Sequence, residues 1–311
     1  MTESKVTFDF IISMYEMYRT PSKDTLKQLN LVVSLYKKDN NNINFFCDTT
    51  KHDLNNWKHN LLKRTSEVTC NNYLRHLKVL YKFSYEENLM DVDLFYKFKF
   101  VPITQTKKKT ISKKDIKEII LYLSKDDNPL KPGWFWIIVI KTLFYTGMRR
   151  RQLVQLKWQD INFDTKNIHL SGGGSKNKRN WDIPLHTDIY SELFELKNRY
   201  LDSLETNKKS DIENLQVFNV TLFNHKYFGN ELKRSQISGF FRKLYEKTEI
   251  RCSSHRYRHR IATDLVNAQK NINEVRDVQY LLGHADIKTT LAYVERNPHK
   301  LRKSLENLVL I

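Results

Sequence analysis

Two series of helical patterns run along this sequence, and a short segment that cannot be helical separates them. Over residues 1–100, apolar side chains recur at spacings of three and four, which is the pattern of an amphipathic helix. Residues 101–110 include Pro102, which has no N–H to donate within a helix, and three consecutive lysines without an apolar anchor. A second helical series begins after Ser112, a residue type that caps helix N-termini. We therefore expect a mainly α-helical chain with two domains and a linker between them.

The domain boundaries are expected at these breaks. The first domain spans residues 1–100, the linker residues 101–111 and the second domain residues 112–311. Apolar spacing in the first domain predicts helices over residues 8–19, 23–38 and 67–88, and one that begins at Thr50 or Asp53. The sequence Asp-Asn-Asn-Asn at residues 39–42 predicts a polar loop.

The second domain combines helices with one glycine-rich hairpin. Two β-like runs, residues 161–170 and 180–185, flank Gly172-Gly173-Gly174-Ser175-Lys176-Asn177, and glycines between such runs are typical of a hairpin. Helices are expected over residues 134–145, 150–158, 231–247, 255–269, 275–282 and 288–293, and a surface loop over residues 203–214. The expected fold is therefore mainly α with a small β-hairpin or sheet.

Positive charge dominates the chain and is concentrated in its second part. The 53 Lys and Arg residues against 35 Asp and Glu residues give a net charge of +18. Residues 1–105 contribute +3 and residues 106–311 contribute +15. A charge of this size favours a polyanionic partner, nucleic acid first, although membranes and acidic proteins also bind basic chains. Lys107, Lys108 and Lys109 are either a solvated linker or a hinge that lies against phosphates.

Cysteine usage and apolar patterning exclude several other classes. Cys47, Cys70 and Cys252 are odd in number and have no Cys-x-x-Cys spacing, so neither a disulfide framework nor a zinc site is expected. No window approaches ~18 uninterrupted apolar residues, and the N-terminus has no apolar signal core. We expect no membrane association, no bound metal and a reducing, cytoplasmic compartment.

Six side chains in the second domain form a set suited to breaking a phosphodiester without metal. They are two arginines, two histidines, a lysine and a late tyrosine, namely Arg149, Lys176, His255, Arg258, His284 and Tyr293. The reaction needs a nucleophile, positive charge at phosphorus and a proton for the departing 5′ oxygen. A tyrosine that loses its proton can be the nucleophile, and the planar fork of arginine gives paired hydrogen bonds to phosphoryl oxygens. Each motif alone is common, so the prediction rests on their order and combination.

The order of these motifs resembles the tyrosine recombinase family, of the phage-integrase type, over about residues 111–305. The segments that carry the resemblance are Thr146-Gly147-Met148-Arg149, the hairpin from Gly174 to Pro184, His255-Arg256-Tyr257-Arg258-His259, Leu281-Leu282-Gly283-His284 and Thr289-Thr290-Leu291-Ala292-Tyr293. One position departs from the family pattern. Three residues after the first arginine the family usually has an acidic residue, and this chain has Gln152, which can form hydrogen bonds but supplies no counter-charge.

The resemblance implies how the phosphate is held and attacked. Tyr293 would be the nucleophile, Arg149 and Arg258 would share the scissile phosphate, and the ring of His284 would form a hydrogen bond with it. Tyr257 is the nearby rival of Tyr293, and its place within the helix motif favours a structural role.

Proton transfer and DNA contact are assigned by the same resemblance. His255 would assist proton transfer from the tyrosine, and Lys176 would protonate the leaving 5′ oxygen as a general acid, with Lys178 as the competing candidate. The basic residues expected to contact DNA are Lys107, Lys108, Lys109, Arg150, Lys178, Arg179 and Arg256.

The resemblance also implies a function and an assembly. The chain would be a site-specific recombinase for DNA integration, excision or resolution, acting through a 3′-phosphotyrosyl link and a Holliday junction without any cofactor. Its first domain would be the helical, SAM-like core-binding domain, which closes around DNA with the catalytic domain as a clamp. A dimer would occupy one site with paired half-sites, and a tetramer two duplexes. The apolar tail after Tyr293 would dock on its own domain or, as we favour, on a neighbouring protomer.

Three rival functions share part of this evidence. A type IB topoisomerase has the same cations but religates the same strand, and a non-catalytic DNA-binding protein would use them only to hold phosphates. A metal-dependent nuclease would need a carboxylate cluster, and the sequence shows no convincing one.

Overall fold

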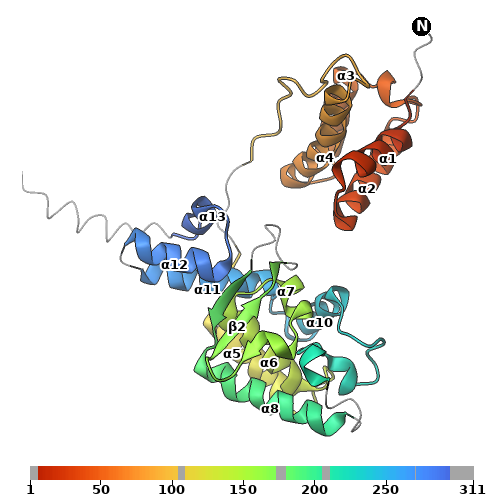
Figure 1. The fold of residues 1–311 in the computed structure, drawn as a ribbon. Helices are drawn as coiled ribbons and strands as arrows, with labels where there is room; N and C mark the ends of the chain where they lie inside the picture. The colour runs from red at the N-terminus through yellow and green to blue at the C-terminus, as the bar shows by residue number, and fades with distance from the viewer. Residues whose placement is uncertain (1–5, 104–108, 173–179, 205–210, 270, 295–311) are drawn as a thin grey trace, which may run out of the picture. The chain divides into compact units, whose positions relative to one another are not determined.

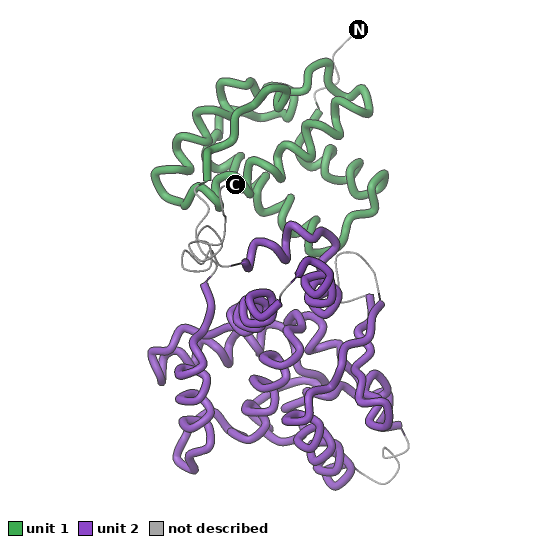
Figure 2. Tube along the Cα trace, turned by 90° about the vertical axis from the view of Figure 1, so that its left-hand side faces the viewer, with its two compact units in different colours: residues 1–106 green, residues 107–311 purple. Residues whose placement is uncertain are grey.

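The computed structural model describes residues 6–103, 109–172, 180–204, 211–269 and 271–294. Within these ranges the fold is mainly helical with a three-stranded antiparallel sheet (Figure 1), which confirms the fold class predicted from the sequence. The chain divides into two compact units, Met1–Thr106 and Lys107–Ile311, which Figure 2 colours separately. None of the helices described combines the length and the apolar character needed to cross a bilayer.

Unit 1 is built from short amphipathic helices with polar caps. They are α1 (Phe8–Arg19), α2 (Lys23–Asp39), α3 (Lys51–Leu62) and α4 (Glu67–Glu86), with the 3-10 turn η1 (Phe46–Asp48). Each helix begins after a Ser or Thr side chain that accepts a first-turn backbone N–H, a donor that has no partner inside the helix. Thr50 rather than Asp53 therefore starts α3. The Asp53 carboxylate completes the capping box by accepting the Thr50 N–H at 2.8 Å.

Aromatic side chains fill the core of unit 1. The Tyr36 ring on α2 meets the Trp57 ring on α3 edge-on, with centroids 5.1 Å apart, and Phe46 stacks on Tyr81 of α4 at 4.0 Å. The Trp57 indole N–H donates to the Asp39 carboxylate at 2.8 Å. Aromatic side chains bury large apolar areas, so these contacts hold the helices together.

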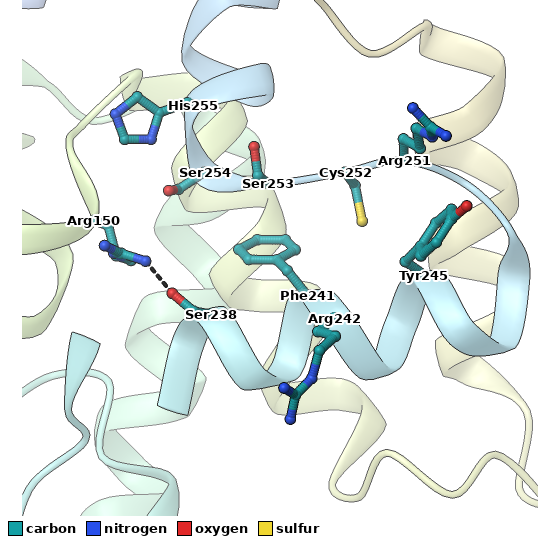
Figure 3. Close-up of a pocket in the computed structure, with 10 residues that line it drawn as sticks. All are labelled: Arg150, Ser238, Phe241, Arg242, Tyr245, Arg251, Cys252, Ser253, Ser254 and His255. Carbon is teal, nitrogen blue, oxygen red and sulfur yellow. Dashed lines mark hydrogen bonds between the residues drawn. The ribbon is translucent and has the colours of Figure 1, made fainter. Parts of the chain in front are cut away.

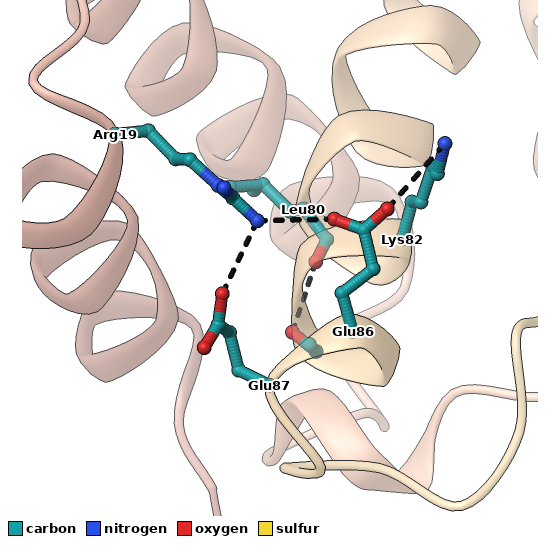
Figure 4. A network of polar contacts seen from close by, with 6 residues as sticks. Arg19, Leu80, Lys82, Glu86 and Glu87 are labelled. Carbon is teal, nitrogen blue, oxygen red and sulfur yellow. Dashed lines mark hydrogen bonds and ion pairs between the residues drawn. The ribbon is translucent and has the colours of Figure 1, made fainter.

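A charged network on the surface joins the ends of α1 and α4 (Figure 4). Arg19 donates to Glu86 and to Glu87, each at 3.1 Å, and Lys82 pairs with Glu86 at 3.4 Å. All four side chains are partly exposed, so water screens their charges and each pair contributes ~1 kcal/mol or less.

In the sequence of unit 2, helices come before and after a small sheet. The described elements are α5 (Lys113–Ser124), α6 (Gly133–Thr146), α7 (Arg150–Gln155), η2 (Trp158–Asp160), β1 (Ile161–Asn162), β2 (Asn167–Leu170), β3 (Trp181–Pro184), α8 (Thr187–Ser203), η4 (Ile212–Asn214), η5 (Val220–Leu222), α10 (Arg234–Thr248), α11 (Ser254–Ala268), α12 (Ile272–Leu282) and α13 (Ile287–Leu291).

Helix α6 forms the centre of the core of unit 2. It is apolar around almost its whole circumference, which is typical of a helix that is buried on all sides. The Trp136 ring stacks on Phe240 of α10 at 3.9 Å with 7° between the planes, and α5 and α11 pack along α6. Gly147 caps α6 with a left-handed φ of 59°, a conformation that glycine adopts without a Cβ clash. This turn delivers Arg149 to the start of α7.

The sheet has the order β1-β2-β3, and β2 and β3 pair as the predicted hairpin strands, with Ile168 opposite Ile183. Alternate residues of both strands are buried, so one face of the sheet packs on the core. The prediction of a single strand over residues 161–170 is wrong in detail. A turn at residues 163–166, in which Lys166 has a φ of 53°, divides it into β1 and β2.

Two helices also differ from the prediction. The helix expected over residues 150–158 ends at Gln155, and the turn η2 follows because the Lys157 N–H bonds to the Asp160 carboxylate at 2.9 Å. Helix α8 lies where no helix was predicted. Its buried side chains nevertheless have amphipathic spacing, namely Ile189, Leu193, Leu196 and Tyr200.

Candidate active site

Arg258 on α11 lies at the centre of the candidate site and joins three helices. Its side chain is 6% exposed. Nη1 donates to the Gly147 carbonyl after α6 at 2.6 Å, and Nη2 donates to the Leu282 carbonyl at the end of α12. Because carbonyls at helix ends lack partners within the helix, these bonds satisfy the carbonyls and fix the guanidinium. Burial and the charge of Arg149 lower the pKa of Arg258 to about 9, and Tyr293 opposes this shift, so the group stays charged at neutral pH.

Arg149 is the N-cap residue of α7, and its guanidinium lies in the same region. The Gln152 side-chain oxygen accepts the Arg149 backbone N–H at 2.8 Å, so glutamine replaces the expected acidic residue as a helix cap without adding charge. Nη2 of Arg149 donates to the Gly283 carbonyl at 3.2 Å. Nη1 is buried and has no hydrogen-bond partner in the described part of the chain. An unpaired buried donor costs free energy, so this atom favours an incoming anion.

Tyr293 follows α13, and its side chain is 5% exposed. Its ring lies parallel to the His284 ring, with centroids 6.1 Å apart and 1° between the planes, and its hydroxyl is 2.7 Å from Nδ1 of His259. Burial raises the pKa of Tyr293, and the charges of Arg258 and Arg149 lower it by less. The phenol is therefore protonated at neutral pH and must lose its proton during nucleophilic attack.

His284 connects the end of α12 to α13. Its side chain is 8% exposed, and its Nδ1 lies 2.9 Å from the Thr290 hydroxyl on α13. Its backbone carbonyl accepts the Gln279 side-chain amide at 2.9 Å. Because Thr290 lies one turn before Tyr293, the same contact that orients the imidazole also positions the tyrosine. The described chain thus brings Tyr293 and His284 together with both arginines.

A pocket of about 410 Å³ opens beside His255, which lies in the first turn of α11 (Figure 3). It lies between α10 and the segment that leads into α11, and it is lined by three arginines, Arg150, Arg242 and Arg251. Their combined charge makes the pocket attractive to an anion.

The His255 imidazole lies among cations. Partial burial lowers the pKa of His255, and the charges of Arg150, Arg258 and Arg149 lower it further, so the ring is neutral at neutral pH. The side chain is exposed overall, and solvent screens part of these interactions. Within the described residues, the hydroxyl of Tyr293 bonds to His259 and not to His255.

Two of the arginines predicted to contact DNA form hydrogen bonds within unit 2. Arg150 donates to the Ser238 hydroxyl on α10, and Arg256 donates to the Thr110 backbone carbonyl at 3.1 Å. Lys109 is exposed. Five predicted residues lie outside the described residues, namely Lys107, Lys108, Lys176, Lys178 and Arg179.

Two further residues of α11 bear on which tyrosine and which histidine take part in the reaction. Tyr257 is completely buried in the main core of unit 2, which agrees with a structural role. His259 was not among the predicted site residues. Its signal in the sequence is its spacing, because positions 255, 258 and 259 share one face of a helix.

Replacement of Gly283 by alanine is expected to destabilise this site. Gly283 has a φ of 58°, and an added Cβ would lie 2.5 Å from Cζ2 of Trp181. The left-handed backbone alone costs a non-glycine residue ~1–2 kcal/mol, and displacement of the indole adds to this. For a unit of this size the melting temperature should fall by ~2–4 °C per kcal/mol, as measured by thermal denaturation. Gly239→Ala is the matched control, because its Cβ would meet nothing within 4 Å, and equal melting temperatures for the two variants would contradict the prediction.

Comparisons with known proteins indicate the family and the fold of the chain. A sequence profile described as the Phage integrase family matches residues 109–300. The chain is 28% identical over 297 residues to a protein of Pseudomonas syringae assigned as a tyrosine recombinase XerC, covering 90% of this chain and 59% of that protein. A Pseudomonas aeruginosa protein of the same assignment is 26% identical over 325 residues, covering 98% of this chain and 71% of that protein. The chain thus spans less than two thirds of the length of the first relative and slightly more than two thirds of the length of the second.

Solved structures share the fold at low sequence identity. The Tn1549 transposon integrase in complex with a circular intermediate DNA aligns with a TM-score of 0.74 at 19% identity, covering 97% of this chain and 100% of that one. A lambda integrase dimer bound to a core site aligns with a TM-score of 0.69 at 15% identity, covering 94% and 79% of the two chains. At these identities the likeness concerns the fold.

Proposed function

We propose that this chain, which belongs to the phage integrase family of tyrosine recombinases, is a site-specific DNA recombinase that works through a 3′-phosphotyrosyl intermediate. The family match confirms the resemblance predicted from the motifs. One observation carries the proposal for the chemistry. The phenol of Tyr293 is buried, the guanidinium groups of Arg149 and Arg258 donate to the neighbouring Gly283 and Leu282 carbonyls, and both charges act on the phenol.

The proposed reaction exchanges one ester for another. The Tyr293 oxygen attacks the scissile phosphorus, the new O–P bond forms, and the bond to the 5′ oxygen breaks. The phenol gives up its proton, and the departing oxygen receives one. A free 5′ hydroxyl from a partner strand then attacks the phosphotyrosine and releases Tyr293. Because the bond energy is conserved in each step, the cycle needs no ATP.

The two arginines would stabilise the charge that develops on the phosphate. Arg258 is held by two backbone carbonyls, so its orientation is set before DNA arrives. Arg149 has a buried Nη1 without a hydrogen-bond partner among the described residues, and a non-bridging phosphoryl oxygen would satisfy it. Donors fixed in advance stabilise a transition state without reorganisation. His284, whose ring lies parallel to the Tyr293 ring, would add a hydrogen bond to the phosphate.

The DNA partner and the assembly are proposed from relatives. The Tn1549 integrase has been seen with circular intermediate DNA, and the lambda integrase as a dimer on a core site. We propose that this chain binds duplex DNA with paired half-sites, as a dimer on one site and a tetramer on two. Residues 1–100 would be the core-binding domain, residues 101–111 the linker and residues 112–311 the catalytic domain with its interaction tail.

The proposed function is tested in two stages. DNA fragments that the protein retains are first recovered and sequenced to find inverted half-sites. A duplex carrying that site, nicked near the scissile phosphate so that the cleaved end diffuses away, should then trap a covalent adduct. Two differently labelled duplexes should exchange strands. Relaxation of supercoils without strand exchange would indicate a topoisomerase, and binding without an adduct would indicate a non-catalytic DNA-binding protein.

Lys176→Ala is expected to slow cleavage of an ordinary nicked substrate ~10²–10⁴-fold, the range for loss of a general acid. A substrate with a 5′-bridging sulfur should be cleaved at nearly the unaltered rate, because a thiolate leaves without protonation. Cleavage rates on both substrates are measured for Lys176→Ala and for Lys178→Ala, the competing candidate. Equal losses on both substrates would refute a general-acid role for Lys176.

A further inference from the structure

Two histidines of α11 lie next to each other at the site, but they face different groups. The rings of His255 and His259 have centroids 6.4 Å apart. His255 is influenced by three arginines and lines the anion-attracting pocket. Nδ1 of His259 lies 2.7 Å from the hydroxyl of Tyr293, which is the distance of a direct hydrogen bond. The atom that would attack phosphorus is therefore in contact with His259.

We propose that His259 is the base that takes the proton of the Tyr293 phenol during DNA cleavage. This assignment rests on the proposed function and replaces His255 in the role expected from the sequence. A general base must lie within hydrogen-bond reach of the proton that it removes, and His259 does so before DNA is bound.

The proton balance defines the form of His259 that the step requires. The step requires a neutral imidazole that carries its proton on Nε2 and accepts the phenol O–H at Nδ1. As the Tyr293 oxygen bonds to phosphorus, the proton passes to Nδ1 and an imidazolium forms. The bond from phosphorus to the 5′ oxygen breaks, and that oxygen takes its proton from the general acid, Lys176 in the proposed function. On rejoining, the imidazolium returns the proton to the released phenol.

The surroundings of the phenol explain why a base is needed. Burial makes the phenol harder to ionise, and the nearby charges of Arg258 and Arg149 offset only part of this effect. A water molecule from bulk solvent would need access to a hydroxyl whose side chain is 5% exposed. A base that is already in contact avoids this requirement.

Helix α11 also fixes the tyrosine at a second point. The Asn267 side-chain amide, two turns after His259, donates to the Tyr293 backbone carbonyl at 3.2 Å. A single rigid helix thus holds both the backbone and the hydroxyl of Tyr293. Preorganisation of this kind keeps the phenol and the imidazole in register through the reaction.

Two substitutions separate proton transfer from simple orientation. His259→Asn places an amide oxygen near the position of Nδ1, so it can accept the hydrogen bond but cannot take the proton. His259→Leu removes both abilities. With the nicked substrate, both variants should form the covalent adduct ~10²–10⁴-fold more slowly than the unaltered protein. His225→Leu, at an exposed histidine of the same unit, is the control and should leave the rate unchanged.

A more acidic nucleophile provides the decisive measurement. For this measurement Tyr293 is replaced by 3,5-difluorotyrosine, whose phenol loses its proton more readily than that of tyrosine. Adduct formation by His259→Asn should recover by ~10-fold or more, since a nucleophile that ionises more easily depends less on its base. DNA affinity and melting temperature of each variant show whether it is folded. Should His259→Leu fail to fold, His259→Asn and its rescue still decide the question.

Each outcome has a defined meaning. Slow adduct formation by both variants, with rescue by the fluorinated tyrosine, supports the proposal. Near-normal rates for folded His259→Asn would show that only hydrogen bonding matters, and lack of rescue would exclude proton transfer, so either result overturns it. Absence of any adduct with the unaltered protein on its recovered site would instead refute the proposed function itself, and the assignment of His259 with it.

Discussion

Tyr293→Phe is expected to abolish denaturant-resistant protein–DNA adducts while DNA binding persists. The change removes the attacking oxygen and keeps the ring that packs against His284 and the apolar side chains of α11 and α12. The lost hydrogen bond to His259 should lower the free energy of unfolding by ~1 kcal/mol. Adducts are counted by denaturing gel electrophoresis of the nicked substrate, and affinity is measured by gel shift at fixed salt concentration.

Tyr257→Phe is the matched control for this experiment. The Tyr257 hydroxyl is buried and has no hydrogen-bond partner among the described residues, so its removal should be nearly neutral for stability and for adduct formation. Adducts that persist in Tyr293→Phe but vanish in Tyr257→Phe would show that the wrong tyrosine has been chosen.

Arg258→Lys is expected to reduce both cleavage and stability, although it preserves the charge. An ammonium cannot donate to the Gly147 and Leu282 carbonyls with the fixed fork of a guanidinium and also contact a phosphate. Loss of one preorganised donor to a transition state typically slows a reaction ~10²–10³-fold. A buried carbonyl left without its donor costs ~1–3 kcal/mol. Single-turnover cleavage and denaturant unfolding measure the two effects.

Arg199→Lys controls for the substitution itself. Arg199 on α8 pairs with Glu195 at 2.6 Å and lies 4.4 Å from the centre of the Trp134 ring, and it is partly exposed, so the variant should lose ~1 kcal/mol or less and retain cleavage. Equal losses of stability in the two variants would mean that the carbonyl contacts of Arg258 do not hold the three helices together.

Local sequence signals predicted many of the helices well because they depend on neighbouring residues. The expected helix over residues 8–19 coincides with α1, and Ser112 caps α5 as predicted. The apolar segment around Trp136 forms a buried helix. Where long-range bonds intervened, the predictions were less accurate. The helix that begins at Arg150 is shorter than expected, and the chain after it bonds to a distant segment, where the Trp158 N–H donates to the Leu215 carbonyl and the Val217 N–H to the Leu156 carbonyl.

The family and the order of the catalytic motifs followed from the sequence alone, because they depend on residue types and their spacing. Helical spacing by itself also places His255, Arg258 and His259 on one face of α11. Spacing could not show which histidine meets the phenol. That choice depends on how α13 packs against α11 and α12, through the bond between His284 and Thr290 and the contact between Tyr293 and His259. Such contacts join residues that are distant in sequence, so only the tertiary structure decides them.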